Sequence, residues 1–194
     1  VLASEPAELL VLDESLAVRK KIGLSDEIRV VSSPSLSIAF ATAYNSPDLV
    51  VVDLKAGKIA KKHAASALID ASKKAKLNDK TTRLTSWPNV SVTPDGAWLF
   101  CNRNGSLHRF RISGVDVTYE EGGPAVGNEP WGVIDFSSDS KYVAIGSAGA
   151  GIGVLDHPSL QTPGAFIYRI DDLQAPLLAL PVGGAATSIV MDKA

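Results

Sequence analysis

The feature that most constrains the fold of this chain is an internal repeat. Trp87–Cys101 (WPNVSVTPDGAWLFC) aligns with Trp131–Ile145 (WGVIDFSSDSKYVAI) at an offset of 44 residues. Each copy has an alternating apolar segment, a turn rich in Ser, Pro, Asp and Gly, and a second apolar segment. Alternation with a period of two predicts strands, and the turn residues predict a tight connection. The repeat therefore predicts the same β-hairpin twice.

The repeat extends beyond a hairpin. Leu107–Ser113 (LHRFRIS) aligns with Phe166–Asp172 (FIYRIDD) and predicts a third strand. Glu8–Ser15 aligns with Asp48–Lys55 at an offset of 40 residues, and each continues into a lysine-rich fourth strand. Ile28–Ser46 supplies the first two strands before the second of these copies. Four strands in about 40 residues is the period of a β-propeller blade.

The two ends of the chain complete the strand count. Ser188–Ala194 has the pattern of a first strand and its turn, and Val1–Ser4 has the pattern of the second strand that should follow. The sequence thus predicts an all-β fold, a single propeller domain over residues 1–194 with about four blades of four antiparallel strands. Three arrangements remain open: four blades closed by pairing of the termini, a part of a larger ring, or one ring built from two chains.

The best-matching segments resemble a known repeat. Gly127–Ser147 (GNEPWGVIDFSSDSKYVAIGS) and Ser91–Ser113 are similar to the bacterial YVTN-type and lactonase-type (WD40-like) β-propeller repeat. The similarity is good over Trp87–Asp172 and weak before it. It implies a propeller scaffold and favours an extracytoplasmic, periplasmic or secreted location. Those families usually have six to eight blades, so four is a departure, and the resemblance implies no particular activity.

Charge and hydropathy exclude several classes of partner. The chain has 19 basic and 21 acidic residues, a net charge of −2, which gives no field for binding nucleic acid. No apolar segment approaches the roughly 18 residues of a membrane-spanning helix, so we expect no membrane insertion. Cys101, the single cysteine, lies in a strand pattern and is predicted to be a small buried hydrophobe with no intrachain disulfide.

Two segments interrupt the repeat. Residues 64–86 contain alanines and lysines without a β-branched run, and they predict a short helix with its lysines outward. Residues 148–164 are rich in Gly and Pro and predict a long, mobile loop between two strands of one blade. We expect both insertions to carry specificity for a partner.

Recognised catalytic motifs do not occur. His63, His108 and His157 are far apart in sequence and lack metal-ligand spacing, so the sequence predicts no metal site and no cofactor. Recurring aspartates occupy the expected turns, where an Asp side chain accepts backbone amides. These are Asp13, Asp53, Asp95, Asp139 and Asp171.

The candidate binding residues come from the connections between strands. Large aromatic residues at the entry to the innermost strands could stack on a ligand or contact a partner, although such residues also commonly pack between blades. Polar residues of the Asn102–Ser106 hairpin and a histidine of the long insertion complete the set. The candidates are Trp87, Pro88, Asn102, Arg103, Pro130, Trp131 and His157.

The function predicted from these features is a non-catalytic scaffold that binds another protein or a subunit of a complex. An enzyme is the first alternative, either a lactonase-like hydrolase or a quinoprotein-dehydrogenase-like subunit, because the same repeat occurs in those families. A propeller module that binds a small solute or a metal is the second alternative. Oligomerisation follows if blades are shared between chains.

Overall fold

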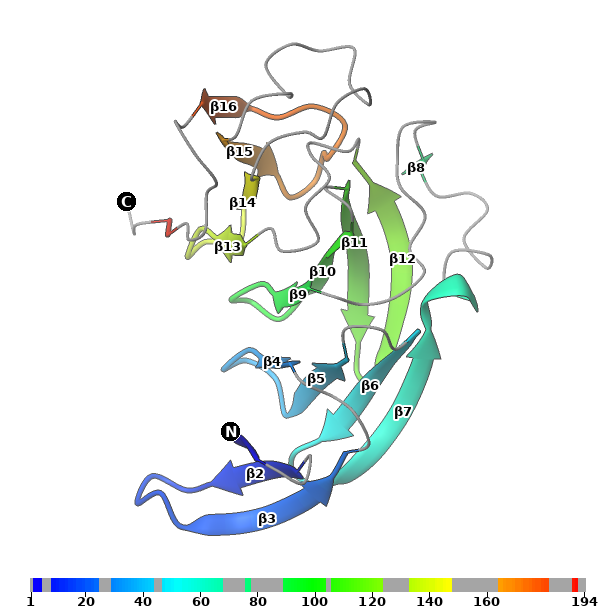
Figure 1. The fold of residues 1–194 in the computed structure, drawn as a ribbon, viewed down its shortest axis with the longest axis vertical. Coiled ribbons are helices and arrows are strands. Elements are labelled where there is room, and N and C mark those ends of the chain that lie inside the picture. Colours follow the sequence, from blue (N-terminus) through cyan, green and yellow to red (C-terminus); the bar gives the residue numbers. More distant parts are fainter. Residues whose placement is uncertain are drawn as a thin grey trace.

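The computed structural model is all-β, with four sheets that fan out from a common inner side (Figure 1). The structure describes residues 2–4, 8–24, 29–43, 47–67, 76–77, 89–103, 106–123, 133–147, 164–181 and 190–191. The sheet at one end of the fan has the first strands of the chain and the sheet at the other end has the last. In this view, the side opposite β7 and β12 is open between these two ends.

Each sheet is a blade whose strands follow one another in chain order. The first sheet is β1 (Leu2–Ser4), β2 (Glu8–Leu12) and β3 (Val18–Gly23). The second is β4 (Arg29–Ser32), β5 (Ile38–Thr42), β6 (Asp48–Asp53) and β7 (Lys58–Ala64). The third is β9 (Asn89–Val92), β10 (Trp98–Arg103), β11 (Ser106–Ser113) and β12 (Asp116–Gly122), to which β8 (Lys76–Leu77) adds in parallel. The fourth is β13 (Ile134–Phe136), β14 (Tyr142–Ser147), β15 (Gly164–Arg169) and β16 (Leu178–Pro181).

The repeat found in the sequence is the repeat of the blades. β2 and β6, which align at an offset of 40 residues, are both third strands if β1 is counted as a second strand, and β3 and β7 are the fourth strands. β11 and β15 are the third strands of the later sheets. The innermost strands β4, β9 and β13 lie next to one another along the inner side of the fan (Figure 1). In the described residues, this arrangement confirms a β-propeller with four blades, of which the first has three strands and the third has five.

Apolar side chains on both faces of the middle sheets hold the blades together. Leu9 and Ile22 of the first sheet pack against Val50 and Val52 of the second. A larger cluster joins the second sheet to the third. Its buried members are Ile38, Phe40, Leu49, Val51, Ala65, Val90, Leu99, Cys101, Phe110, Val117 and Tyr119. A third cluster joins the third sheet to the fourth, with Phe100 in contact with Phe136 at a ring separation of 5.3 Å.

The turns between first and second strands also connect neighbouring blades. Ser33 donates its hydroxyl to the carbonyl of Pro94 at 2.8 Å, and the Asp95 amide donates to the Ser140 hydroxyl at 3.2 Å. Gly96 has a φ of +72° and a Cβ there would lie 2.5 Å from the Ser35 hydroxyl oxygen, so this turn requires glycine. The Ser-Pro-Asp-Gly type of turn therefore closes a hairpin and contacts the next blade.

Two expectations need correction. The segment predicted as a helix is helical over residues 65–67, but Lys76 lies in strand β8 and not on a helix face. The termini do not share a blade in the described residues: β1 pairs with β2 in the first sheet, whereas the Met191 amide donates to the Asp135 carboxylate of the fourth sheet at 2.7 Å. Val190 and Met191 are not in a strand. Most of residues 182–194 lie outside the described residues.

Candidate functional site

A hollow with a volume of about 270 Å³ lies where the third and fourth sheets meet. It is formed by the start of β10, the turn before β14 and the end of β15 with the loop that follows. The residues that line this Trp98–Tyr142 hollow are Trp98, Ser140, Lys141, Tyr142, Arg169, Ile170 and Asp171. The site therefore takes residues from both blades.

The repeat itself places the two aromatic rings of the hollow. Trp98 is the first residue of β10 and pairs with Arg111, while Tyr142 is the first residue of β14 and pairs with Arg169. The identical register confirms that Trp98 and Tyr142 occupy equivalent places in successive blades. Trp98 is half-buried, and the guanidinium carbons of Arg109 and Arg111 lie 4.6 Å and 4.2 Å from its ring centroid. These cation–π contacts fix the ring at the edge of the hollow.

Charged side chains at the rim of the hollow are paired locally. Arg169 donates to both carboxylate oxygens of Asp171, at 3.0 and 3.1 Å. Lys141 forms an ion pair with Asp139 at 3.0 Å. Both pairs are exposed, so each contributes little to stability. They matter for the chemistry of the hollow instead, because Lys141, Arg169 and Asp171 are each already paired with a side chain of opposite charge.

These pairs keep the rim carboxylates ionised. The hydrogen bond from Arg169 lowers the pKa of Asp171, and hydrogen bonds from Ser137 and then Lys141 lower the pKa of Asp139. A general acid that works near neutral pH needs a raised pKa instead. The two carboxylates therefore suit ion pairing and hydrogen-bond acceptance, not proton donation.

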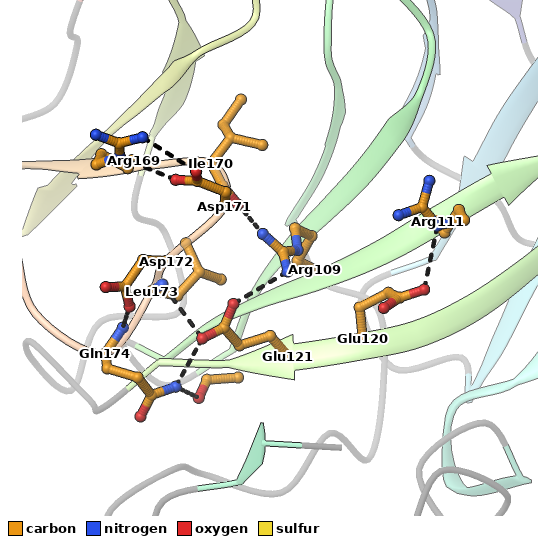
Figure 2. Close-up of polar contacts among 11 residues, drawn as sticks. Arg109, Arg111, Glu120, Glu121, Arg169, Ile170, Asp171, Asp172, Leu173 and Gln174 are labelled. Carbon is orange, nitrogen blue, oxygen red and sulfur yellow. Dashed lines mark hydrogen bonds and ion pairs between the residues drawn. The ribbon is translucent and has the colours of Figure 1, made fainter. Parts of the chain in front are cut away.

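Beneath the hollow, a buried ion pair clamps the third sheet to the fourth (Figure 2). Arg109 of β11 and Glu121 of β12 are neighbours in the ladder, with 3.1 Å between Nη2 and Oε2. Arg109 also donates to the carbonyl of Ile170. The Oε1 atom of Glu121 accepts from the Leu173 amide at 3.3 Å and from the Gln174 side chain at 2.9 Å. The pair thus binds the loop that leads from β15 to β16.

Burial makes this clamp sensitive to the loss of either partner. The side chains of Arg109 and Glu121 are 10% and 0% exposed. Burial lowers the pKa of Arg109, and the negative charge of Glu121 opposes that shift. A buried charge is tolerated when it is paired and hydrogen-bonded, and it is costly when alone. The junction between these two blades therefore depends on a specific buried ion pair as well as on apolar contacts.

Among the candidates predicted from sequence, Asn102 is the one with a described side chain. It is 1% exposed near the end of β10, and within the described residues its Oδ1 has no hydrogen-bond partner. Arg103 is the last residue of β10. The other candidates lie outside the described residues, although Trp87 and Pro88 precede the innermost strand β9, and Pro130 and Trp131 precede β13. His157 lies in the insertion predicted at 148–164, of which the structure describes only Gly164, at the start of β15.

Sequence reasoning did not find the residues that form the hollow and the clamp. Arg109 and Arg169 lie in the segments aligned as third strands, Leu107–Ser113 and Phe166–Asp172, and no sequence motif singles out Glu121. The equivalence of Trp98 and Tyr142 was the available signal, because two large aromatic residues at one repeat position lie at the same height in adjacent blades. Four of the turn aspartates accept local backbone amides as predicted, Asp13, Asp53, Asp95 and Asp139, at 2.9, 2.7, 3.0 and 3.2 Å. Asp171 accepts from the Arg169 guanidinium instead, and the backbone amide of its turn donates to Asp172.

Comparison with solved structures supports the propeller fold. The chain is similar to the Kuenenia stuttgartiensis hydrazine synthase, with a TM-score of 0.60 and 10% identity, over 90% of this chain and 43% of that one. It is also similar to the β-propeller domain of Myceliophteria thermophila Cps50 (Swd1), with a TM-score of 0.50 and 13% identity, over 80% of this chain and 43% of that one. The chain thus spans less than half the length of either protein. No family model and no curated protein matches the sequence.

The described part of the chain contains no helix long and apolar enough to cross a membrane. In the same residues, no group of three or more His, Cys, Asp or Glu side chains is placed to hold a metal ion.

Proposed function

We propose that this chain is a non-catalytic β-propeller module, a single domain over residues 1–194, that binds another protein through the Trp98–Tyr142 hollow. The observation that carries the proposal is the composition of the hollow: Trp98, Tyr142 and Arg169 meet at the junction of two blades. Trp, Tyr and Arg are the residues most enriched in the energetic centres of protein interfaces. Paired charges around them resemble the polar rim of such a centre.

The size of the hollow favours a protein partner over a small molecule. Sites for small ligands commonly have volumes of roughly 300–1,000 Å³. The hollow, at about 270 Å³, suits a single apolar or aromatic side chain of a partner that packs beside Trp98. Polar groups of the partner then meet Arg169 and Asp171 at the rim.

The chemistry of the rim favours binding over catalysis. A lactonase-like hydrolase or a quinoprotein-dehydrogenase-like subunit needs a side chain held ready to donate or accept a proton. The carboxylates beside this hollow have lowered pKa values and strong local partners. The similarity to a hydrazine synthase, at 10% identity, concerns the fold.

Two arginines provide a matched test of the proposal. Arg169 lies at the hollow and pairs with Asp171, while Arg19 lies in the first sheet and pairs with Asp13 at 2.7 Å. Their side chains are 60% and 69% exposed. Replacement by Ala removes the same group from a similar environment at two distant places.

The assay is affinity enrichment from an extract of the source organism, followed by titration of the identified partner. We expect Arg169→Ala and Tyr142→Ala to weaken binding by about tenfold or more, a typical loss for an interface centre. Arg19→Ala should bind as the wild-type chain does. A partner that binds all variants equally would show that the hollow is not the site. Hydrolysis of a sugar lactone that is lost in Tyr142→Ala would support the enzyme alternative instead.

A further inference from the structure

The outer edge of the second sheet has main-chain groups that point away from the sheet. β7 is the last strand of that sheet, and no strand in the described residues pairs with its outer side (Figure 1). The Ala65 amide donates to the Pro47 carbonyl at 2.9 Å, which continues the ladder between β6 and β7. Because hydrogen bonds alternate along an antiparallel pair, the main-chain groups of Lys62 and Ala64 point outward. A strand laid beside β7 would find donors and acceptors there.

The side chains along this edge are basic and exposed. The five consecutive residues from Lys58 to Lys62 are all exposed, and β7 contains three lysines and no acidic residue. Lys61 forms an ion pair with Asp116 of the third sheet, whereas Lys58 and Lys62 have no ion-pair partner within the described ranges. Lysines on an edge strand discourage two copies of that strand from pairing. They leave the edge open to a strand of opposite charge.

The equivalent edge of the next blade already has an added strand. β12 is the fourth strand of the third sheet, as β7 is of the second. β8 pairs with β12 in parallel, with Lys76 opposite Glu121 and Leu77 opposite Gly122. β8 comes from the insertion between the second and third sheets and is not one of the four strands of a blade. The outer edge of a blade in this fold therefore accepts a further strand.

We propose that the β7 edge binds an extended acidic segment of a partner protein, which adds to the second sheet as a fifth strand. The main chain of the segment pairs with the outward groups of Lys62 and Ala64, and its carboxylates lie beside the ammonium groups of Lys58 and Lys62. In strand addition, main-chain hydrogen bonds give affinity and alternate side chains give selectivity. This surface is separate from the Trp98–Tyr142 hollow, which lies between the third and fourth sheets.

Other parts of the same polypeptide suit this edge less well. Further blades pack on the faces of the end sheets, whereas β7 lies on the outer border of a sheet between two others (Figure 1). The insertion that supplies β8 is itself lysine-rich and would bring like charges beside β7, which is unfavourable. Its lysines are Lys73, Lys74, Lys76 and Lys80. A second copy of β7 has the same disadvantage.

A peptide also suits the edge better than a nucleic acid does. The neighbouring outer strand β12 carries Asp116 and Glu120, whose side chains are 56% and 34% exposed. These carboxylates repel a polyanion that runs along the outer surface. A nucleic acid also lacks the main-chain amides that would continue the ladder from β7.

The probe is a synthetic peptide of seven residues, the length of β7, in which Glu alternates with Val. Its binding to the full chain is measured by fluorescence anisotropy. Replacement of every Glu by Gln removes the charge of the peptide, and N-methylation of its amides removes the main-chain donors. We expect each change to weaken binding by about tenfold or more.

Two variants of the chain test charge and main chain separately. Lys62→Glu should weaken binding of the Glu peptide by about fivefold or more, the effect of an exposed charge pair. Lys21→Glu is the matched control, because Lys21 is exposed at the equivalent place of β3, and it should bind as the wild-type chain does. Ala64→Pro keeps every lysine but removes an outward amide, so it should abolish binding without breaking the ladder to β6.

Several results would overturn the proposal. They are the absence of saturable binding to the wild-type chain, equal binding of the N-methylated peptide, and an equal loss of binding in Lys21→Glu and Lys62→Glu. A single-stranded DNA oligonucleotide that binds more tightly than the Glu peptide would indicate a site for polyanions instead. Melting curves establish that each variant is folded, and if Ala64→Pro is not, the N-methylated peptide makes the same test on the wild-type chain.

Discussion

The sharpest prediction concerns the Arg109–Glu121 pair. Glu121→Gln keeps the shape of the side chain and removes its charge, which leaves the guanidinium of Arg109 buried without a counter-charge. Removing one partner of a buried ion pair costs about 3–5 kcal/mol in the free energy of unfolding. For a chain of this length, roughly 2–4 °C of melting temperature corresponds to each kcal/mol, so we expect a loss of roughly 6–20 °C.

The fourth sheet indicates which apolar residues can replace both members of the pair in a double variant. Arg109→Ile with Glu121→Leu installs the side chains that the fourth sheet has at the same positions, Ile167 and Leu178. An apolar replacement of both partners of a buried pair is often nearly neutral. The carbonyl of Ile170 loses its donor in this variant, which costs about 1–3 kcal/mol. The double variant should therefore be more stable than either single variant.

The assay is equilibrium unfolding in urea of the wild-type chain, Arg109→Ile, Glu121→Leu and the double variant, which together form a double-mutant cycle. We expect a coupling energy of about 2 kcal/mol or more between the two positions. Single variants that each lose less than about 1 kcal/mol, as exposed pairs do, would refute the reasoning. So would an additive double variant, because it would show that the two charges do not depend on each other.

Three further predictions follow from single positions. Gly96→Ala should lower the free energy of unfolding by more than about 1 kcal/mol in urea titrations, because φ is +72° and the added Cβ meets a side-chain oxygen 2.5 Å away. Cys101 is fully buried and should react with a thiol reagent only in denaturant, which an absorbance assay detects. Hydrogen bonds, first from Ser15, lower the pKa of Asp13 below 3.8, so Asp13 stabilises the fold above that pH and the contribution is lost as pH falls through the folded-state pKa. Asp13→Asn should flatten the acid limb of the unfolding curve, and an unchanged limb would contradict this.

The blades could be predicted from sequence because each copy of the repeat predicts the same strands and turns. The alignment of Glu8–Ser15 with Asp48–Lys55 placed two third strands correctly, and both copies carry the same register shift against the fourth strand. Turn chemistry was equally visible, since Asp95 and Gly96 define a tight turn in any context. Local periodicity and turn residues are thus sufficient to predict the strands and turns of this chain.

The site could not be predicted in the same way, because it depends on which sheet faces meet. Arg109 follows His108 and Glu121 follows Glu120, as charged residues of an exposed strand can, and the contacts that hold them come from the loop after β15 in the next blade. Lys76 was assigned to a helix from its neighbours, whereas a parallel contact with β12 draws it into a strand. Both errors come from tertiary contacts that override a local pattern.

Equivalent faces of the third and fourth sheets differ in how closely they specify the neighbour that covers them. The face of the third sheet that packs against the fourth contains Asn102, Arg109 and Glu121, and the ion pair accepts only a neighbour that offers carbonyl and amide groups in the right places. At the fourth sheet, the equivalent pair is Ile167 and Leu178, which any apolar face of suitable shape can cover. Apolar burial contributes about 25 cal/mol per Å² without fixing a partner's orientation. The junction between the third and fourth sheets is therefore set by polar geometry as well as by apolar burial.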